Sequence, residues 1–232
     1  MKHRAFDLFC NIAIVNFPKD ITHAEKKEFA KKILEENRNI KTILEKSGKF
    51  SGRLRKMKTK FLAGEKTKEV LYRENGCVFR FNIDSTYFSP RLSNERKEIA
   101  SKIKNGEEVL VMFAGVGPYS IVIAKNSGAS KVYSNEINRE ANKYAKLNIE
   151  LNNLKNKIEL LPGDIKKVAE DLKKQKKKFN VIVMPRPQLK DTFLREAFKL
   201  SKKGTRIYYY DFCKADEISS IKEKVLKEAS KS

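Results

Sequence analysis

The sequence predicts an α/β fold in which a mainly parallel, doubly wound sheet follows a small α+β module. From residue 109 onward, short apolar runs alternate with segments of helical spacing, as expected of parallel strands joined by crossover helices. The first run, 109–113, ends at the turn Gly115-Val116-Gly117. Glycines at a strand end permit a tight turn and the close approach of a ligand to the backbone. An ordinary tight turn is the simpler alternative.

The predicted sheet has five strands, each followed by a helix. We place the strands near 109–113, 131–136, 157–161, 179–184 and 205–212, and the helices near 119–126, 138–153, 165–173, 190–201 and 215–229. In a sheet of this kind the ligand crevice lies beyond the carboxyl ends of the strands.

The preceding part of the chain is predicted to be an α+β module with antiparallel strands. We expect strands over 8–17, 40–44, 53–62, 69–73 and 77–83, with a hairpin turn at Asn75-Gly76. Thr22 is the expected N-cap of a helix that reaches Leu34, and Ser89 opens a further helix toward Ile103. These elements suggest two domains, 1–84 and 85–232.

The composition favours a soluble protein with a polyanionic partner. The 51 Lys and Arg residues against 29 Asp and Glu give a net charge of +22, and neutralising phosphates releases counterions. Solubility alone is an alternative explanation for lysines dispersed on helix faces. The chain lacks both a run of about 18 apolar residues and an apolar signal core after Met1, so we expect a cytoplasmic location.

A metal site is not expected. Cys10, Cys77 and Cys213 are widely spaced and fit reduced thiols, and the two histidines, His3 and His23, both lie near the N-terminus. Carboxylates, arginines and backbone groups must therefore supply the chemistry.

The crevice residues favour one class of nucleotide ligand over another. Ser120 occupies the third glycine position of the dinucleotide fingerprint, which therefore fails. S-adenosylmethionine methyltransferases use a looser glycine loop, an acid after the second strand and a polar group after the third. Glu136 and Asp164 occupy those two places. For Asp164, a helix N-cap is an equally good explanation.

Several segments together resemble the archaeal and eukaryotic tRNA guanine-37 N1-methyltransferases. Two segments carry most of the resemblance, Tyr87-Phe88-Ser89-Pro90-Arg91-Leu92-Ser93-Asn94-Glu95-Arg96 and Met112-Phe113-Ala114-Gly115-Val116-Gly117-Pro118. Further matches are 52–55, 62–65, 136–138, 163–164 and 208–212. The resemblance implies a Rossmann-like class I methyltransferase domain that binds S-adenosyl-L-methionine, a preceding RNA-binding domain, and the anticodon stem-loop of tRNA as partner.

The resemblance also implies roles for individual residues. Glu95 would be the general base that deprotonates guanine N1, and Arg55 would stabilise charge on O6, with Arg53 contacting a phosphate beside it. Glu95 could instead be an ordinary first-turn helix carboxylate, and Arg91 could cap turn carbonyls. The implied cofactor-binding residues are Tyr87, Arg91, Phe113, Ala114, Gly115, Val116, Gly117, Glu136, Ile137, Asp164 and Pro185.

The chain departs from the family pattern in three places. Val111 replaces an acid at the end of the first strand, and Pro185-Arg186-Pro187 replaces a motif that begins with Asn. We expect that the family's domain for the outer corner of tRNA and its closing antiparallel strand pair are missing from this sequence, which is either a minimal version or part of a longer chain. Because an amide is lost at Pro185, C7 methylation of the tricyclic wyosine intermediate at the same position is a second expected activity. Aminocarboxypropyl transfer and RNA binding without catalysis are the remaining alternatives.

Overall fold

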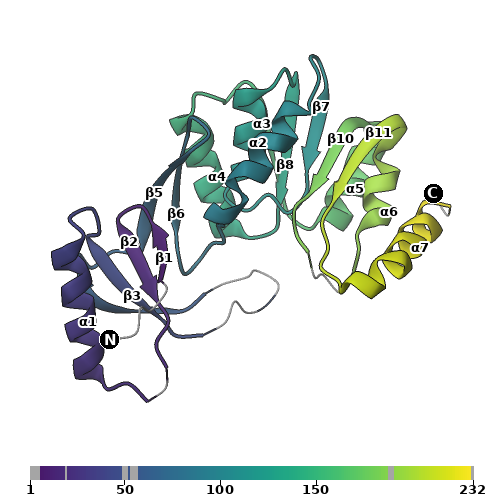
Figure 1. Cartoon of the computed structure of the whole chain (residues 1–232). Coiled ribbons are helices and arrows are strands. Elements are labelled where there is room, and N and C mark those ends of the chain that lie inside the picture. The colour runs from purple at the N-terminus through teal and green to yellow at the C-terminus, as the bar shows by residue number, and fades with distance from the viewer. Residues whose placement is uncertain (1–5, 19, 49–51, 53–56, 188–190, 231–232) are drawn as a thin grey trace. The chain divides into compact units, whose positions relative to one another are not determined.

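The computed structural model describes residues 6–18, 20–48, 52, 57–187 and 191–230. The chain divides into two compact units, Met1–Ser93 and Asn94–Ser232. Figure 1 labels the elements of both units.

The first unit combines a four-stranded sheet, a helix packed on it and a two-stranded hairpin. Its elements are β1 (Phe6–Phe9), β2 (Ile12–Val15), α1 (His23–Glu36), β3 (Thr42–Lys46), β4 (Thr59–Gly64), β5 (Glu69–Glu74), β6 (Cys77–Asn82) and η1 (Pro90–Leu92). The sheet order is β1-β2-β3-β4. Strands β2 and β3 run parallel, and the other neighbours are antiparallel.

The single strand predicted over 8–17 is wrong. The chain reverses after Phe9, and Phe9 pairs with Ile12 in an antiparallel hairpin. Cys10, at the turn, has a φ of 51°. This turn contains neither Gly nor Pro, so the apolar run appears continuous in the sequence.

Two local predictions in this unit are confirmed. Asn75 and Gly76 have φ angles of 48° and 72°, which a type I′ hairpin turn between β5 and β6 requires. Thr22 caps α1, because its hydroxyl accepts from the Glu25 amide at 3.3 Å while Glu25 accepts from the Thr22 amide at 2.8 Å. Ala30 and Ile33 then bury one face of α1.

Phe88 anchors the segment that follows the hairpin. Its ring stacks on Phe81 with centroids 4.7 Å apart and planes at 10°, and it also contacts Tyr72 and Phe79. Aromatic pairs of this kind stabilise packing beyond the area they bury. The segment from Tyr87 to Arg91 is therefore fixed on β5 and β6.

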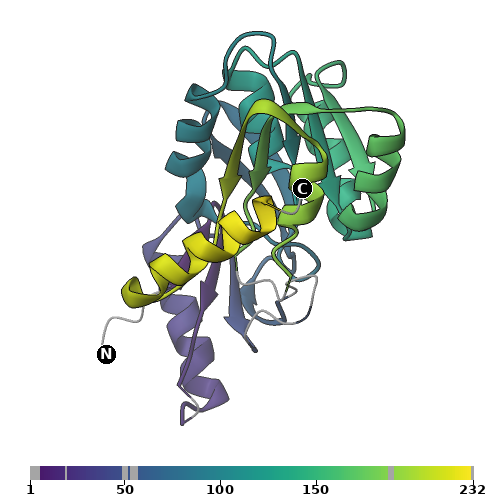
Figure 2. The same ribbon diagram turned by 90° about the vertical axis from the view of Figure 1, so that its right-hand side faces the viewer.

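The second unit is a parallel sheet with helices on both faces (Figures 1 and 2). Its elements are α2 (Ser93–Ser101), which begins at the unit boundary, β7 (Glu108–Val111), α3 (Pro118–Asn126), β8 (Lys131–Glu136), α4 (Arg139–Leu151), β9 (Ile158–Pro162), α5 (Ile165–Lys174), β10 (Phe179–Met184), α6 (Leu194–Lys199), β11 (Ser201–Tyr209), η2 (Ala215–Glu217) and α7 (Ile218–Ala229). The strand order is β11-β10-β7-β8-β9, and each neighbouring pair is parallel. The predicted doubly wound sheet is confirmed.

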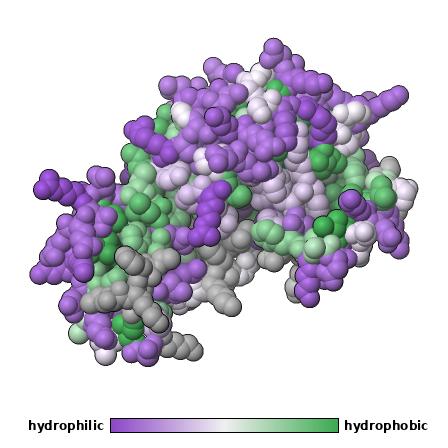
Figure 3. All heavy atoms as spheres, viewed as in Figure 1, coloured by the Kyte–Doolittle hydropathy of each residue, from purple (hydrophilic) through white to green (hydrophobic). Residues whose placement is uncertain are grey.

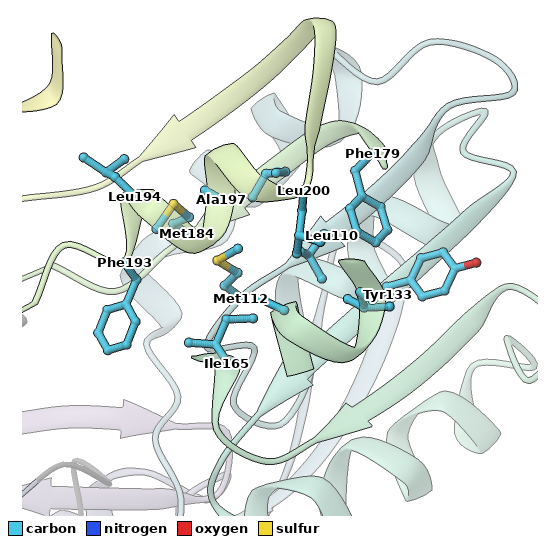
Figure 4. Packing of buried hydrophobic residues seen from close by; sticks show 13 residues of the cluster. Leu110, Met112, Tyr133, Ile165, Phe179, Met184, Phe193, Leu194, Ala197 and Leu200 are labelled. Atoms are coloured by element: carbon cyan, nitrogen blue, oxygen red, sulfur yellow. The ribbon is translucent and has the colours of Figure 1, made fainter. Parts of the chain in front are cut away.

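Alternating residues of the central strands bury the two faces. Leu110, Met112 and Met184 point into a cluster formed with residues of α5 and α6 (Figure 4). Phe179 and Tyr133 close the cluster with an edge contact at 5.2 Å. This core fixes the central strand β7 and, with it, the loop that leaves its carboxyl end.

The predicted element ends are less accurate late in the chain. Strand β11 begins at Ser201 and ends at Tyr209, whereas 205–212 was expected. Helix α6 is confined to Leu194–Lys199, whereas 190–201 was expected, and residue 190 lies outside the described residues. Gly204, with a φ of 85°, lies inside β11, and because glycine is typical of turns the sequence predicts a later strand start.

Among the described residues, no helix has the length and apolarity needed to span a membrane.

Candidate active site

Four loops of the second unit meet beyond the carboxyl ends of adjacent parallel strands. They carry Phe113–Gly117 after β7, Glu136 and Ile137 at and after β8, Asp164 after β9 and Pro185 after β10. Backbone hydrogen bonds join neighbouring loops: Ala114 donates to the Asn135 carbonyl and Gly163 to the Glu136 carbonyl, both at 2.8 Å. Met112 donates to the Val183 carbonyl at 2.9 Å. The order in which the chain adds strands to the sheet reverses between β7 and β10, and such sheets bind ligands at that point.

The glycine loop turns tightly, and a side chain of α4 hydrogen-bonds to its backbone. Gly115 and Gly117 have φ angles of 60° and 87°, and Phe113 has 56°. A Cβ atom on Gly117 would come within 3.3 Å of Ile121. The carbonyl of Val116 accepts a 3.0 Å hydrogen bond from Nδ2 of the fully buried Asn148 on α4. The loop is therefore preorganised by α4, a contribution that the sequence did not reveal.

Glu136 is oriented by two backbone amides. Its Oε2 accepts from the Gly115 amide at 2.8 Å, and its Oε1 accepts from the Asn138 amide at 2.7 Å. The residue is only 7% exposed. Each carboxylate oxygen has two lone pairs, so the carboxylate can still accept from a pair of hydroxyls. This acceptor set fits the ribose of a nucleoside cofactor.

Asp164 acts as a helix cap in this structure. Its Oδ1 accepts from the Lys166 amide at 3.0 Å, at the start of α5. The helix cap, one of the two equally good explanations for this residue, is therefore observed, and a contact with adenine stays a prediction. Ile137 and Pro185 are partly buried beside their strand ends.

Val111 is fully buried within β7. It pairs with Ser134 on β8 and Val183 on β10. The family pattern has an acidic residue at this position. Here the aliphatic side chain of Val111 packs in the hydrophobic core instead.

Glu95 lies in the first turn of α2, half-buried, and is engaged by a residue distant in sequence. The hydroxyl of Tyr210 donates a short hydrogen bond to Oε1 of Glu95. Burial first, and then this bond, raise the pKa of Tyr210 far above its ordinary value. The resemblance to the tRNA guanine-37 N1-methyltransferases includes the segment that contains Tyr210, but it implies no role for that residue. A run of three tyrosines was the only available signal.

Arg96 and Tyr119 lie next to this pair. Arg96 is 1% exposed, and its Cζ lies 5.8 Å from the centroid of the Tyr119 ring. The Tyr119 ring in turn makes an edge contact with Tyr210, with centroids 6.3 Å apart. Because Tyr119 is in the first turn of α3, it connects the helix that follows the glycine loop to Tyr210.

The other predicted site residues belong to the first unit. Arg91 pairs with Asp7 at 2.7 Å, and its side chain is 83% exposed. An ion pair this exposed is weak, so the guanidinium can exchange Asp7 for another anion. Tyr87 precedes the anchored Phe88 and is half-buried. Arg53 and Arg55 lie outside the described residues.

The chain matches a known protein family over most of its length. A model described as the TRM5/TYW2 methyltransferase domain matches residues 70–232. The chain belongs to the TRM5/TYW2 methyltransferase family. A second model, the TYW2 N-terminal domain, matches residues 2–67 of this TRM5/TYW2 family member.

Individual relatives agree with this assignment. A tRNA (guanine(37)-N(1))-methyltransferase, Trm5b of Pyrococcus abyssi, is 36% identical over 208 residues, covering 90% of the chain and 60% of the relative. The tRNA (guanine(37)-N(1))/4-demethylwyosine(37)-methyltransferase Taw22 of Nanoarchaeum equitans is 33% identical and covers 97% of the chain and 90% of the relative. The chain of aTrm5 solved with tRNALeu superposes with a TM-score of 0.84 at 29% identity, over 95% of this chain and 63% of that one. The chain thus spans about three fifths of the length of Trm5b.

Proposed function

We propose that this TRM5/TYW2 family member is an S-adenosylmethionine-dependent tRNA methyltransferase that modifies N1 of guanosine 37. The observation that carries the proposal is the Glu136 carboxylate, held by the Gly115 and Asn138 amides at the edge of the sheet where a nucleoside would bind. The names of Trm5b and Taw22 support tRNA position 37 as the substrate.

Residues at the carboxyl ends of β7 to β10 would hold S-adenosylmethionine. Glu136 would accept hydrogen bonds from the two ribose hydroxyls. The backbone of the glycine loop, Phe113 to Gly117, would lie directly against the cofactor. Asp164 and Ile137 would border the adenine, and Pro185 would close the side next to β10. Tyr87 and Arg91 are assigned to the cofactor and base pockets by family resemblance. When bound, the cofactor supplies a methyl group activated by its sulfonium charge.

Glu95 would take the proton from guanine N1. Glu95 lies in the first turn of α2, and its carboxylate would be the acceptor of that proton. Removal of the proton by Glu95 would leave an electron pair on N1 to attack the methyl group that the cofactor supplies. Negative charge that builds on O6 would be stabilised by Arg55, an assignment that rests on the resemblance alone.

The first domain would bind the RNA. We propose residues 1–84 as an RNA-binding domain and 85–232 as the cofactor-binding domain. A net charge of +22 favours contact with the phosphates of an anticodon stem-loop. The fit to a relative solved with tRNALeu supports tRNA as the partner.

Methylation of C7 in 4-demethylwyosine at the same position is the second candidate function. Two observations favour it: Pro185 provides no side-chain amide to select guanine, and the Nanoarchaeum equitans relative carries both activities in its name. A site without a directed hydrogen bond discriminates weakly between bases of different shape.

Nucleoside analysis by mass spectrometry tests both candidates. Unmodified tRNA with guanosine 37 is incubated with the protein and labelled S-adenosylmethionine, and a parallel sample carries 4-demethylwyosine at that position. Label in 1-methylguanosine supports the first function, and label at C7 of the tricyclic base supports the second. A transferred aminocarboxypropyl group, or binding of tRNA without any transfer, would contradict both.

A further inference from the structure

We infer that Tyr210 is a positioning residue for the reaction: its hydroxyl holds the Glu95 carboxylate in the orientation that receives the substrate proton. The inference rests on the proposed function, because it assigns Glu95 the role of base. Neither the sequence pattern nor the names of the relatives assign Tyr210 a part in the reaction.

Even-numbered residues of strand β11, and Tyr210 directly after it, lie along helix α2. Arg206 donates to the Lys102 carbonyl at 2.6 Å, just past the end of α2. The Nζ of Lys102 lies 5.9 Å from the ring of Tyr208, and Tyr210 reaches Glu95 in the first turn of the same helix. Because side chains alternate along a strand, these three residues share one face. They fix α2 from its last turn to its first.

Tyr209 has the opposite orientation. Its ring packs against the cluster that contains Met184, Leu194 and Ala197, and its hydroxyl donates to Asp211 at 3.0 Å. The three consecutive tyrosines therefore have three different partners. Only the Tyr210 hydroxyl reaches the carboxylate assigned to catalysis.

The Tyr210–Glu95 contact orders one carboxylate oxygen and leaves the other for the substrate. Tyr210 donates to Oε1, and the structure records no hydrogen bond from a described residue to Oε2 of Glu95. A carboxylate in a first helical turn can adopt several rotamers, and a fixed donor selects one of them. Proton transfer requires the base within hydrogen-bond reach of the proton, so selecting the rotamer serves the reaction directly.

Tyr210 is itself supported and remains a donor. Tyr119 packs against its ring at 6.3 Å, and burial together with the bond to Glu95 raises the pKa of Tyr210, so it stays protonated at working pH. Since Tyr119 is the second residue of α3, which directly follows the glycine loop, the rings of Tyr119 and Tyr210 link that loop to Glu95. Glu95 would thus already be oriented by Tyr210 when a cofactor binds at the glycine loop.

The test is a double-mutant cycle in single-turnover methyl transfer to tRNA with guanosine 37. Tyr210→Phe removes only the hydroxyl, and we expect the rate to fall on the order of ten- to one-hundredfold, as for a misplaced reacting group. The KM for tRNA, the Kd for S-adenosylhomocysteine and the Tm should stay unchanged. Tyr209→Phe, which removes the neighbouring hydroxyl from the opposite face, is the matched control and should retain the wild-type rate.

Measuring Tyr210→Phe in the Glu95→Gln protein distinguishes a positioning role of Tyr210 from a purely structural one. If Tyr210 acts through Glu95, adding Tyr210→Phe to Glu95→Gln should cause no further loss, because coupled residues are not additive. Equal losses in the two backgrounds, a Tyr210→Phe rate within twofold of wild type, or a loss explained by weaker tRNA or cofactor binding would each overturn the inference while the proposed function stands. No transfer by the wild-type protein would overturn the proposed function and, with it, the inference.

Discussion

The backbone amide of Gly115 donates a 2.8 Å hydrogen bond to Oε2 of Glu136. The turn after β7 and the acid at the end of β8 are therefore one unit, although 21 residues separate them in sequence. The bond fixes the carboxylate against the loop, so the two groups expected to hold the cofactor are oriented by each other. Disturbing either should affect cofactor binding more than protein folding.

Glu136→Ala should weaken S-adenosylmethionine and S-adenosylhomocysteine together. Hydrogen bonds to a charged group contribute about 1.5–3 kcal/mol, which corresponds to about ten- to one-hundredfold in Kd. Isothermal titration calorimetry with both ligands measures the change. Glu140→Ala removes a surface carboxylate that pairs with Lys143 on the following helix, and it is the matched control. Equal affinities for the wild type and Glu136→Ala would mean that the crevice has been assigned wrongly.

Glu95→Gln should slow methyl transfer and leave cofactor affinity intact. The substitution keeps the size and the acceptor for Tyr210 but removes the proton-accepting charge, and loss of a general base costs about 10²–10⁴-fold in rate. Single-turnover rates with labelled cofactor give the comparison. Glu98→Gln alters an exposed carboxylate of the same helix that pairs with Lys102, and should have little effect. A rate within a few-fold of wild type would show that another group takes the proton.

Affinity for tRNA should fall steeply as salt is raised. The face seen in Figure 3 is covered mainly by hydrophilic residues, and the chain carries a net charge of +22. Several phosphate contacts imply a log–log slope on the order of −3 to −6. Filter binding across a potassium chloride series measures it, and S-adenosylhomocysteine binding in the same series is the control. A slope near zero for tRNA would argue against a phosphate-driven RNA interface.

Pro185→Asn should narrow the choice of base. A side-chain amide at the end of β10 would supply the directed hydrogen bond that the proline lacks, and sites with such a group reject analogues that cannot pair with it. In a competition between tRNAs carrying guanosine or 4-demethylwyosine at position 37, the substitution should shift methylation toward guanosine. An unchanged ratio, or no reaction of the wild type with the tricyclic base, would break the link between Pro185 and specificity.

The sequence alone determined the main architecture of the second unit. Apolar runs bounded by turn residues are strong signals because each strand of a parallel sheet is buried on both faces, and the runs at 131–136 and 179–184 match β8 and β10. The strand-end positions of Glu136 and Asp164 follow from the same alternation. The sequence failed where local signals mislead: the turn at Cys10 lacks Gly and Pro, and Gly204 lies inside a strand.

Only the tertiary structure decided which side chains meet. Asn148 reaches the Val116 carbonyl and Tyr210 reaches Glu95 across 32 and 115 residues of sequence. Such contacts depend on the strand order and on which face of α2 and β11 each residue occupies, and a linear pattern contains neither. The sequence therefore located the loops and, through the family resemblance, suggested Glu95 as a candidate base, while the packing of the helices against the sheet selected the residues that contact them.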